Sequence, residues 1–560
     1  MSSSLDLLSS KSQIVPCYVD GKLFHGSSQY EVLDPHDNSK VLHQVSSITV
    51  DDVPKILETS ARAFKTWKKT PVTERRNIFL KAAALLKERQ GDYAAVEVAE
   101  TTSGPGWAGF EVFMGIDSIE EAAASATLAL RGEIATTEAG KRAYISRCPY
   151  GVVFAMAPWN APFVLSQRAA LNPVSFHVCI FVTSRHCITS LGIKFLLTAF
   201  VSCLSSCDQI IGGNTCILKT SEMSPKTQLT LAQLMHDAGL PAGVLNVVHV
   251  APKDAPAVCE AIIAYDAVGK INFTGSTRVG SIIASIAGKH IKPLVLELGG
   301  KAPAIVCHDA DLSNACQAIA FGGWMNSGQV CMATQTVIAH ESIAEKLVGL
   351  LNEHVKNVSA AGEGAPLRGL FTQASAERAK GIVDDALGKG AKVAAGEWKV
   401  EDNLVQPILL QGVTPKMQIY KTEMFAPIFS IVTFKDEEEA IRIANDHEYG
   451  LSASVFTTDV ARGMKLAEEI DSGAVHINGA SVSTIVVPDS GPSEAVRGAT
   501  PIADGFGLVW QVHDSAAHPH GGWKKSGYGR FNGIEGIREF MQFKTITVNE
   551  PHPYPGFLFM

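Results

Sequence analysis

The spacing of apolar residues divides the chain into two kinds of structure. Over residues 51–69 and 73–100, apolar side chains recur at intervals of three and four, which predicts two amphipathic helices. From residue 150, short apolar runs such as GVVFAMAP and TCILKTS alternate with helical stretches. A second alternating series follows PLVLELGGKAPAIV. Such alternation of strands and helices predicts parallel sheets with helices on both faces.

Two shorter features complete the predicted architecture. Asp20-Gly21, within VDGKLF, is typical of the turn of a β-hairpin. Near the C-terminus, FKTITVNE is a lone strand that follows a helix, and the chain shows no internal repeat. We therefore expect an α/β protein with two doubly wound parallel-sheet domains and a small β element.

The composition indicates an enzyme rather than a nucleic-acid-binding or membrane protein. Of the 560 residues, 46% are hydrophobic and 19% are charged, which suits globular cores. The formal net charge is −8 and no block of lysine or arginine occurs, which argues against nucleic acid or an anionic membrane as a partner. Eleven scattered cysteines favour reduced thiols, and the first residues lack the pattern of a secretory signal. We therefore expect a cytoplasmic protein.

Two residues have the character of catalytic groups. Glu297, in the apolar run PLVLELGGKAP, could be only a carboxylate at a strand edge. Its apolar neighbours would also raise its pKa toward neutrality, which suits a general base. Cys331, in NSGQVCMAT, could be a small buried hydrophobe or a nucleophile, and a nucleophile needs access and help in forming a thiolate.

Three further motifs could bind a ligand, although each could also be an ordinary turn or loop. In FTGSTRVG, Gly275 precedes Ser276 at a strand-to-helix junction, where a pyrophosphate can bind. In CILKTSE, Lys219 and Glu222 follow a buried strand, where open α/β sheets bind ligands, and Glu222 would repel a 2′-phosphate. In APWNAPF, prolines flank Asn160 and would preorganise its amide, a neutral donor that suits an oxyanion.

The order and spacing of these motifs resemble the signature motifs of the aldehyde dehydrogenase superfamily, from about residue 17 to residue 550. GWAGFEV and APWNAP look most like the branch that handles aromatic aldehydes such as salicylaldehyde and vanillin. The motifs that carry the resemblance are PWN (158–160), KTSE (219–222), FTGS (273–276), ELGGK (297–301), GQVC (328–331), EMFAP (423–427) and GGWKKSG (521–527).

This resemblance implies an NAD-dependent oxidation of a mid-sized aromatic aldehyde to the acid. Cys331 would attack the aldehyde carbon, Asn160 would hold the oxyanion, and Glu297 would activate the water that hydrolyses the thioester. Glu222 favours NAD over NADP, and no metal is implied. The cofactor-binding residues implied by the resemblance are Trp159, Lys219, Glu222, Gly275, Ser276, Gly299, Glu423 and Phe425.

The resemblance also implies a division into domains. A variant Rossmann domain that binds NAD would comprise residues 1–130 and 150–298, and a catalytic domain would comprise residues 299–541. Residues 131–149 and 542–560 would form an oligomerisation element that joins subunits into a homodimer or homotetramer.

Two segments have no counterpart in the family pattern. Removing residues 174–209 and 482–511 leaves seamless joins and 494 residues, a normal length for the family. Both segments begin with Val-Ser and end with Gln, as in-frame translation of an unspliced intron would. Our leading hypothesis is therefore two retained introns.

The first segment contains the apolar run VCIFVTSRHCITSLGIKFLLTAFVSCL, for which three other interpretations remain open. It could be a membrane span, although the run contains charged residues. It could also be a zinc site or a genuine accessory insertion. If the two segments obstruct the substrate tunnel, the alternative function is a catalytically silent oligomeric or binding protein with the same fold.

Overall fold

The computed structural model describes residues 7, 14–171, 209–361, 365–481 and 518–550. The two candidate insertions lie outside these residues, apart from Gln209, and so do the interpretations attached to them. Among the described residues, no helix combines the length and apolar character that crossing a membrane requires. The same residues contain no cluster of His, Cys, Asp and Glu side chains that could hold a metal ion.

The predicted hairpin is present at the N-terminus. Strands β2 (Cys17–Val19) and β3 (Lys22–Phe24) pair antiparallel around Asp20 and Gly21, whose φ angles are 55° and 76°. Positive φ at both central residues is the geometry of a type I′ turn, which matches the twist of the two strands. Strand β2 also pairs with an inner strand, so the hairpin extends the first large sheet.

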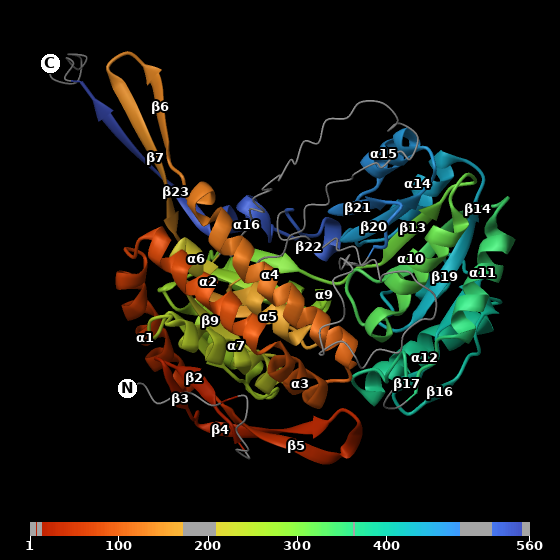
Figure 1. Ribbon diagram of the computed structural model, residues 1–560, viewed down its shortest axis with the longest axis horizontal. Helices are drawn as coiled ribbons and strands as arrows, with labels where there is room; N and C mark the ends of the chain where they lie inside the picture. The colour runs from red at the N-terminus through yellow and green to blue at the C-terminus, as the bar shows by residue number, and fades with distance from the viewer. Residues whose placement is uncertain (1–6, 8–13, 172–208, 362–364, 482–517, 551–560) are drawn as a thin grey trace, which may run out of the picture.

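The first helices differ in one respect from the prediction. Helix α1 (Val53–Trp67) forms as expected, but the single helix expected over 73–100 is two helices, α2 (Val72–Glu88) and α3 (Gln90–Glu100). They are separated at Arg89, whose φ and ψ of −114° and 20° are not helical. Helix α4 (Pro105–Ala129) follows and packs against α2 and α3 (Figure 1).

The first large sheet has five parallel inner strands and antiparallel edges. Its inner strands are buried on both faces, as in Val152–Met156, which explains their continuous apolar sequences. Helices α5 (Pro162–Ala170), α7 (Pro225–Ala238), α8 (Ala255–Ala264) and α9 (Thr277–Lys289) and the short α6 (Gln209–Gly212) connect the strands. The strand order is β22 (Gly527–Tyr528), β12 (Leu294–Glu297), β11 (Val268–Thr274), β8 (Val152–Met156), β9 (Thr215–Lys219), β10 (Leu245–Val248), β2 and β3.

The second large sheet is parallel except at β15, and together the two sheets confirm the predicted α/β fold class. Figure 1 shows its helices on both faces. They are α10 (Leu312–Trp324), α11 (Ala344–Lys356), α12 (Gln373–Gly388), α14 (Glu437–Asn445) and α15 (Val460–Glu469). The strand order is β15 (Lys392–Ala395), β18 (Ile408–Gln411), β19 (Ile428–Phe434), β14 (Thr334–His340), β13 (Ala302–Val306), β20 (Ser452–Phe456) and β21 (Ala474–Ile477).

Smaller elements complete the described part of the chain. A third sheet joins β1 (Ile14–Val15), β5 (Asp37–Ser47) and β4 (Ser28–Asp34). A two-stranded ribbon joins β16 (Val400–Glu401) and β17 (Leu404–Val405). The short helices are η1 (Val50–Asp52), η2 (Met325–Gly328), α13 (Gln418–Lys421), η4 (Lys524–Ser526) and α16 (Gly533–Glu539).

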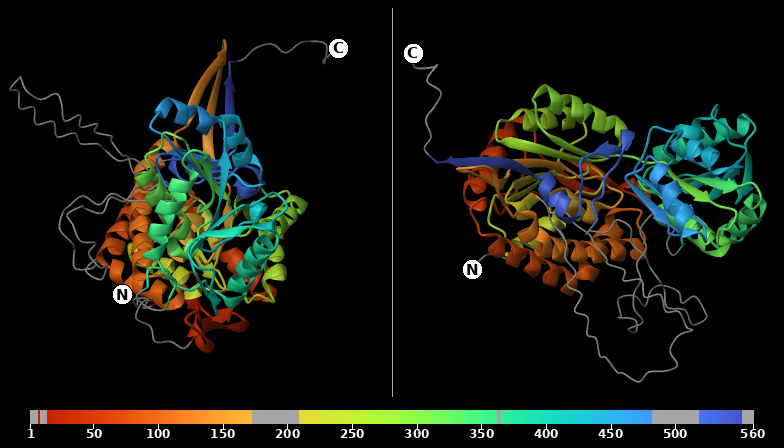
Figure 2. Two further views of the ribbon diagram at one scale, coloured as in Figure 1. Left: turned by 90° about the vertical axis from the view of Figure 1, so that its right-hand side faces the viewer. Right: turned by 90° about the horizontal axis from the view of Figure 1, so that it is seen from above.

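A three-stranded antiparallel arm projects from the first unit (Figures 1 and 2). It consists of β6 (Glu133–Glu138), β7 (Lys141–Pro149) and β23 (Met541–Asn549). Strand β23 pairs with β7 along its whole length, from Met541 opposite Pro149 to Asn549 opposite Lys141. Two segments that lie almost 400 residues apart in the sequence therefore form one element.

The end of the second unit returns to the first. Strand β22 pairs with β12, and Phe531 and Phe540 are buried against Val153 and Val295. Residues 527–540 therefore pack with the first sheet, whereas the sequence analysis assigns them to the catalytic domain. The proposed domain boundaries stay a prediction.

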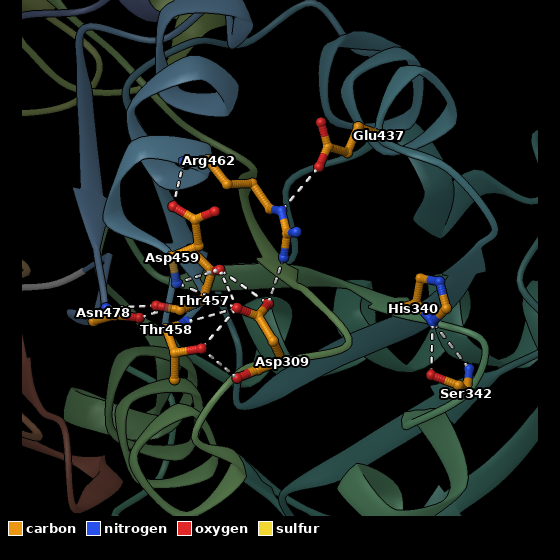
Figure 3. Close-up of polar contacts among 9 residues, drawn as sticks. All are labelled: Asp309, His340, Ser342, Glu437, Thr457, Thr458, Asp459, Arg462 and Asn478. Carbon is orange, nitrogen blue, oxygen red and sulfur yellow. Dashed lines mark hydrogen bonds and ion pairs between the residues drawn. The ribbon is translucent and has the colours of Figure 1, made fainter.

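Asp309 fastens the loop after β13 to the loop after β20 (Figure 3). Its carboxylate accepts hydrogen bonds from the hydroxyls of Thr457 and Thr458, from the backbone N–H groups of Thr458 and Asp459, and from Arg462 Nη1 at 2.9 Å. These donors hold the pKa of Asp309 well below its usual value, although partial burial works against them. A surface pocket of about 600 Å³ lies beside this network, at the opposite end of β14 from Cys331.

We predict that Asp309→Ala destabilises the second unit by about 2 kcal/mol, because several partly buried donors lose a charged acceptor. Because the pKa of Asp309 is lowered, the difference in the free energy of unfolding between wild type and variant has its full size at neutral pH. It shrinks as the pH falls below about 4. Thermal unfolding across this pH range measures the effect. Asp266→Ala, at an exposed position, is the matched control and should change the midpoint little.

Candidate active site

The candidate residues lie at the carboxyl ends of the parallel strands of the first sheet. Strand β8 ends before Trp159 and Asn160, β9 ends at Lys219, β11 ends just before Gly275, and β12 ends at Glu297. In open α/β sheets this edge is where ligands bind, because loops and helix N-termini converge there. Cys331 comes from the other unit, three residues before β14.

Cys331 and Glu297 are in direct contact. The thiol of Cys331 donates a hydrogen bond to Glu297 Oε1 at 3.4 Å. Burial raises the pKa of Cys331 well above its ordinary value, and the carboxylate of Glu297 raises it further. In this state the group is therefore a thiol whose proton points at an acceptor.

A strained turn delivers Cys331 to this position. Asn326 and Ser327, in η2, have φ angles of 48° and 55°, which are uncommon for residues other than glycine. Gly328 follows at 71°, and a Cβ at Gly328 would lie 2.2 Å from the carbonyl oxygen of Ala426. The turn therefore requires glycine at this position.

Glu297 does not have the raised pKa that its apolar sequence neighbours predict. Its side chain is fully buried, and burial alone would raise the pKa. However, the guanidinium of Arg168, on α5, forms an ion pair with Glu297 Oε2, and the ring of His520 lies 3.6 Å from Oε1. These partners lower the pKa of Glu297 to about 2. The expectation fails because the residues next to Glu297 in space are not its neighbours in sequence.

The sequence analysis missed Arg168 and His520 as members of this cluster. A signal for Arg168 was available, because it is the one charged residue in the apolar helical segment PFVLSQRAA that follows Asn160. Nothing in the local sequence of His520 distinguishes it from the neighbouring histidines.

Asn160 connects the loop after β8 to the turn before Cys331. Its Nδ2 donates to the carbonyl oxygen of Gln329 at 2.9 Å, and its own carbonyl accepts from Asn326 Nδ2 at 2.9 Å. The side chain is buried. The structure therefore holds the Asn160 amide against the backbone of Gln329, which is two residues before Cys331.

Aromatic side chains line one side of this region. The ring of Trp159 lies 5.8 Å from that of Phe425 and 4.7 Å from that of Phe371, measured between centroids. The structure thus brings together Trp159 and Phe425, which were predicted, and Phe371, which was not. Phe371 is held by its backbone N–H, which donates to Gln329 Oε1 at 2.9 Å.

Four helices, α5, α7, α8 and α9, start at this edge of the sheet, and buried carboxylates occupy the N-termini of α5 and α7. Glu111 Oε2 accepts from the N–H groups of Phe163 and Val164 at the start of α5. Glu100 accepts from those of Lys226 and Thr227 at the start of α7. Both N-termini are therefore closed to an anionic ligand.

The start of α9 differs from those of α5 and α7. Among the described residues, no carboxylate receives its N–H groups, and Ser276 caps the helix by accepting from Val279 N at 3.4 Å. Ser276 is exposed, and Gly275 is partly exposed. A Cβ at Gly280 would lie 2.5 Å from Leu298, so glycine lets α9 pack closely on the sheet. This helix start can therefore receive a phosphate group.

The remaining predicted residues flank the same edge. Lys219 Nζ lies 3.9 Å from Glu222, whose carboxylate is partly exposed. Glu423 Oε1 accepts from Gly300 N at 2.9 Å, and burial raises its pKa to about 7. A Cβ at Gly299 would lie 2.4 Å from Glu423 Oε2, so the close approach of this carboxylate depends on glycine.

We predict that Arg168→Gln slows alkylation of Cys331 by iodoacetamide at mildly alkaline pH. The guanidinium lowers the pKa of Cys331, and removing it leaves fewer thiolates to react. The pH profile of alkylation, followed by peptide mass spectrometry, should move to higher pH. Arg378→Gln, at a residue that binds the carbonyls of Glu423 and Met424, is the control for the loss of a nearby arginine. A profile that moves to lower pH in Arg168→Gln would contradict the prediction.

Comparisons with known proteins agree with the motifs. The family model described as the aldehyde dehydrogenase family matches residues 24–176, 195–512 and 506–546. A vanillin dehydrogenase from Pseudomonas sp. (strain HR199 / DSM 7063) is 36% identical over 97% of this chain and 99% of its own. A salicylaldehyde dehydrogenase from Pseudomonas sp. (strain C18) is 35% identical over 91% and 93%.

Solved structures show the same similarity. The crystal structure of a salicylaldehyde dehydrogenase from Pseudomonas putida G7, complexed with salicylaldehyde, has a TM-score of 0.82 and 32% identity, covering 97% of this chain and 100% of that one. An NAD-dependent aldehyde dehydrogenase from Sinorhizobium meliloti has a TM-score of 0.80 and 29% identity, covering 99% and 98%. As the order of its motifs predicts, the chain belongs to the aldehyde dehydrogenase family of oxidoreductases.

Proposed function

We propose that the protein oxidises a mid-sized aromatic aldehyde to the carboxylic acid with NAD as the oxidant. The observation that carries the proposal is the contact between the thiol of Cys331 and the carboxylate of Glu297, with the amide of Asn160 beside them. The similarity to proteins named vanillin and salicylaldehyde dehydrogenase supports an aromatic substrate.

The chemistry begins with the thiol. As the Cys331 proton moves to Glu297, the sulfur attacks the aldehyde carbon, a C–S bond forms and the carbonyl electron pair moves to oxygen. The Asn160 amide and the Cys331 backbone N–H stabilise this oxyanion, and one such donor is typically worth about 10²–10³ in rate. When bound, NAD supplies the acceptor for the hydride that leaves the aldehyde carbon.

Glu297 has a second task. After the hydride has left, the acyl group remains on Cys331 as a thioester, and water must attack it. Glu297 first passes the Cys331 proton to solvent, and the carboxylate then accepts the proton of that water. With a pKa of about 2 the carboxylate is a weak base while it is paired with Arg168. The proposal therefore requires Glu297 to separate from Arg168 during the cycle.

The residues present fit a dinucleotide. The start of α9, with Gly275 and Ser276, can hold the pyrophosphate, because, unlike the starts of α5 and α7, it is not closed by a carboxylate of the described residues. Lys219 and Glu222 would hold the adenosine ribose, and the partly exposed carboxylate of Glu222 favours NAD over NADP. The residues that would contact the nicotinamide end of the cofactor are Trp159, Gly299, Glu423 and Phe425.

We predict that Cys331→Ala abolishes NADH formation from benzaldehyde-type substrates, because the sulfur that forms the covalent adduct is lost. Asn160→Ala should lower kcat by about 10²–10³-fold through loss of one oxyanion donor. Glu297→Gln should form NADH more slowly, because the acceptor of the Cys331 proton is lost, and should stall at the thioester after no more than about one equivalent per site. NADH absorbance measures all three, with an aliphatic aldehyde for comparison.

Cys148→Ser, at a partly buried cysteine of the arm, is the control and should retain activity. Undiminished turnover by Cys331→Ala would contradict the proposal. Wild-type protein that oxidises none of the aldehydes would instead favour the alternative, a catalytically silent oligomeric or binding protein.

We further propose that the arm joins subunits into a homodimer or homotetramer. Large apolar side chains lie exposed on one face of its strands, where Ile134, at 68% exposure, and Ile546, at 53%, flank Tyr144 in register. Monomeric proteins rarely expose such a contiguous apolar patch, and a second copy can cover it.

We predict that the double variant Ile134→Lys and Ile546→Lys lowers the mass measured by light scattering, because buried lysines would oppose assembly. Met464→Lys, at an exposed apolar residue of α15, is the matched control and should leave the mass unchanged. An unchanged oligomer in the double variant would place the interface elsewhere.

A further inference from the structure

The helix that follows Asn160 begins without a cap of its own. Its N-cap position is Ala161, which has no side-chain acceptor for the first N–H groups. Glu111, from the middle of α4, supplies the acceptor: its Oε2 receives Phe163 N at 3.0 Å and Val164 N at 3.1 Å. A residue 50 positions away in the sequence thus fixes the start of α5.

Glu111 is fully buried and lies against a second acid, Glu97 of α3. Burial and the neighbouring carboxyl group raise the pKa of Glu97 well above its usual value. Two buried carboxyl groups in contact cannot both be ionised, so one carries a proton. Glu111 Oε1 and both oxygens of Glu97 are buried, with Ser103 beside Glu97 and Trp107 beside Glu111. A proton shared between the two carboxyl groups would form a hydrogen bond between their buried oxygens.

The buried acid is linked to Asn160 by a short, stiff piece of chain. Only Ala161 and Pro162 separate Asn160 from Phe163, and proline fixes its own φ. The Asn160 amide in turn depends on its backbone position to reach the carbonyl of Gln329. One turn before Glu111, helix α4 carries Trp107, which packs against the apolar cluster that includes Val330 and Cys331. Helix α4 therefore holds the start of α5 through Glu111 and packs, through Trp107, against the apolar cluster beside the nucleophile.

Glu100 forms a parallel arrangement at the next helix. It accepts from Lys226 N at 2.8 Å and from Thr227 N at 2.6 Å at the start of α7, and His43 Nε2 lies 3.1 Å from it. Helix α7 follows the loop of Lys219 and Glu222, so this acid holds the predicted cofactor loop rather than the predicted oxyanion donor.

We propose that Glu111, paired with Glu97, is a positioning residue that sets the oxyanion donor Asn160, and that Glu100 is the corresponding positioning residue for the cofactor loop. This inference rests on the proposed function. According to this inference, Glu111 affects kcat and Glu100 affects the KM for NAD. A general loss of stability would not separate these two effects.

The first test compares Glu111→Leu with Glu111→Gln. The leucine removes both acceptors at the start of α5, and kcat should fall by about 10–100-fold while the KM for NAD changes by less than about twofold. The glutamine should restore kcat to within about threefold of wild type. Its amide oxygen accepts the same N–H groups, and its NH₂ donates to Glu97. Glu100→Leu should show the reverse pattern, with an unchanged kcat and a KM for NAD raised about tenfold.

A double-mutant cycle shows whether Glu111 acts through Asn160. In the Asn160→Ala background, Glu111→Leu should lower kcat by no more than about twofold, because the donor that it positions is already absent. If Glu111→Leu does not fold, Glu111→Asp, which is one methylene too short to reach α5, takes its place in the cycle.

Full additivity with Asn160→Ala, or a wild-type kcat in a folded Glu111→Leu protein, would overturn the inference. Equal changes in the KM for NAD in Glu111→Leu and Glu100→Leu would do the same. Failure of the proposed function is distinguishable, because it would appear as absent turnover in the wild-type protein.

Discussion

The contact between Cys331 and Glu297 requires the two large sheets to lie close together. The two residues belong to different sheets, and only Leu298 to Lys301 separate the end of β12 from the start of β13. The connection must be tight, because a Cβ at Gly300 would lie 2.3 Å from the carbonyl oxygen of Cys331. Glycine at 299 and 300 therefore serves packing as much as ligand approach: the backbone of one unit lies directly against the nucleophile turn of the other.

Buried acids arrange the edge of the first sheet around this contact. Glu111 and Glu100 satisfy the first N–H groups of α5 and α7, whereas the start of α9 carries the serine and glycine of the FTGS motif. Glu111 and Glu100 therefore stabilise two helix starts and also exclude an anionic ligand from them. An anion that approaches the FTGS motif meets a helix start that no carboxylate of the described residues occupies, whereas the starts of α5 and α7 are already neutralised.

The sequence predicted the architecture and most of the candidate residues. Particular residues show which features could not be predicted from it. Strand–helix alternation identified both sheets, because burial on both faces produces continuous apolar runs such as VVFAM. The break at Arg89 was not visible, because the apolar spacing continues across it. The low pKa of Glu297 was not visible either, because Arg168 and His520 reach it from segments that are 129 and 223 positions away. Glu111 looks like any glutamate in a helix until the start of α5 is placed next to it.

The return of β22 to the first sheet also constrains how the protein can be synthesised. The edge strand that pairs with β12, together with Phe531 and Phe540, emerges from the ribosome only after the whole second unit has been made. The first unit therefore cannot complete its core during most of translation, whereas the second unit, encoded as one internal stretch, can fold first. Release of a truncated chain that ends before residue 527 would leave the edge of β12 unpaired, and an open strand edge of this kind invites aggregation.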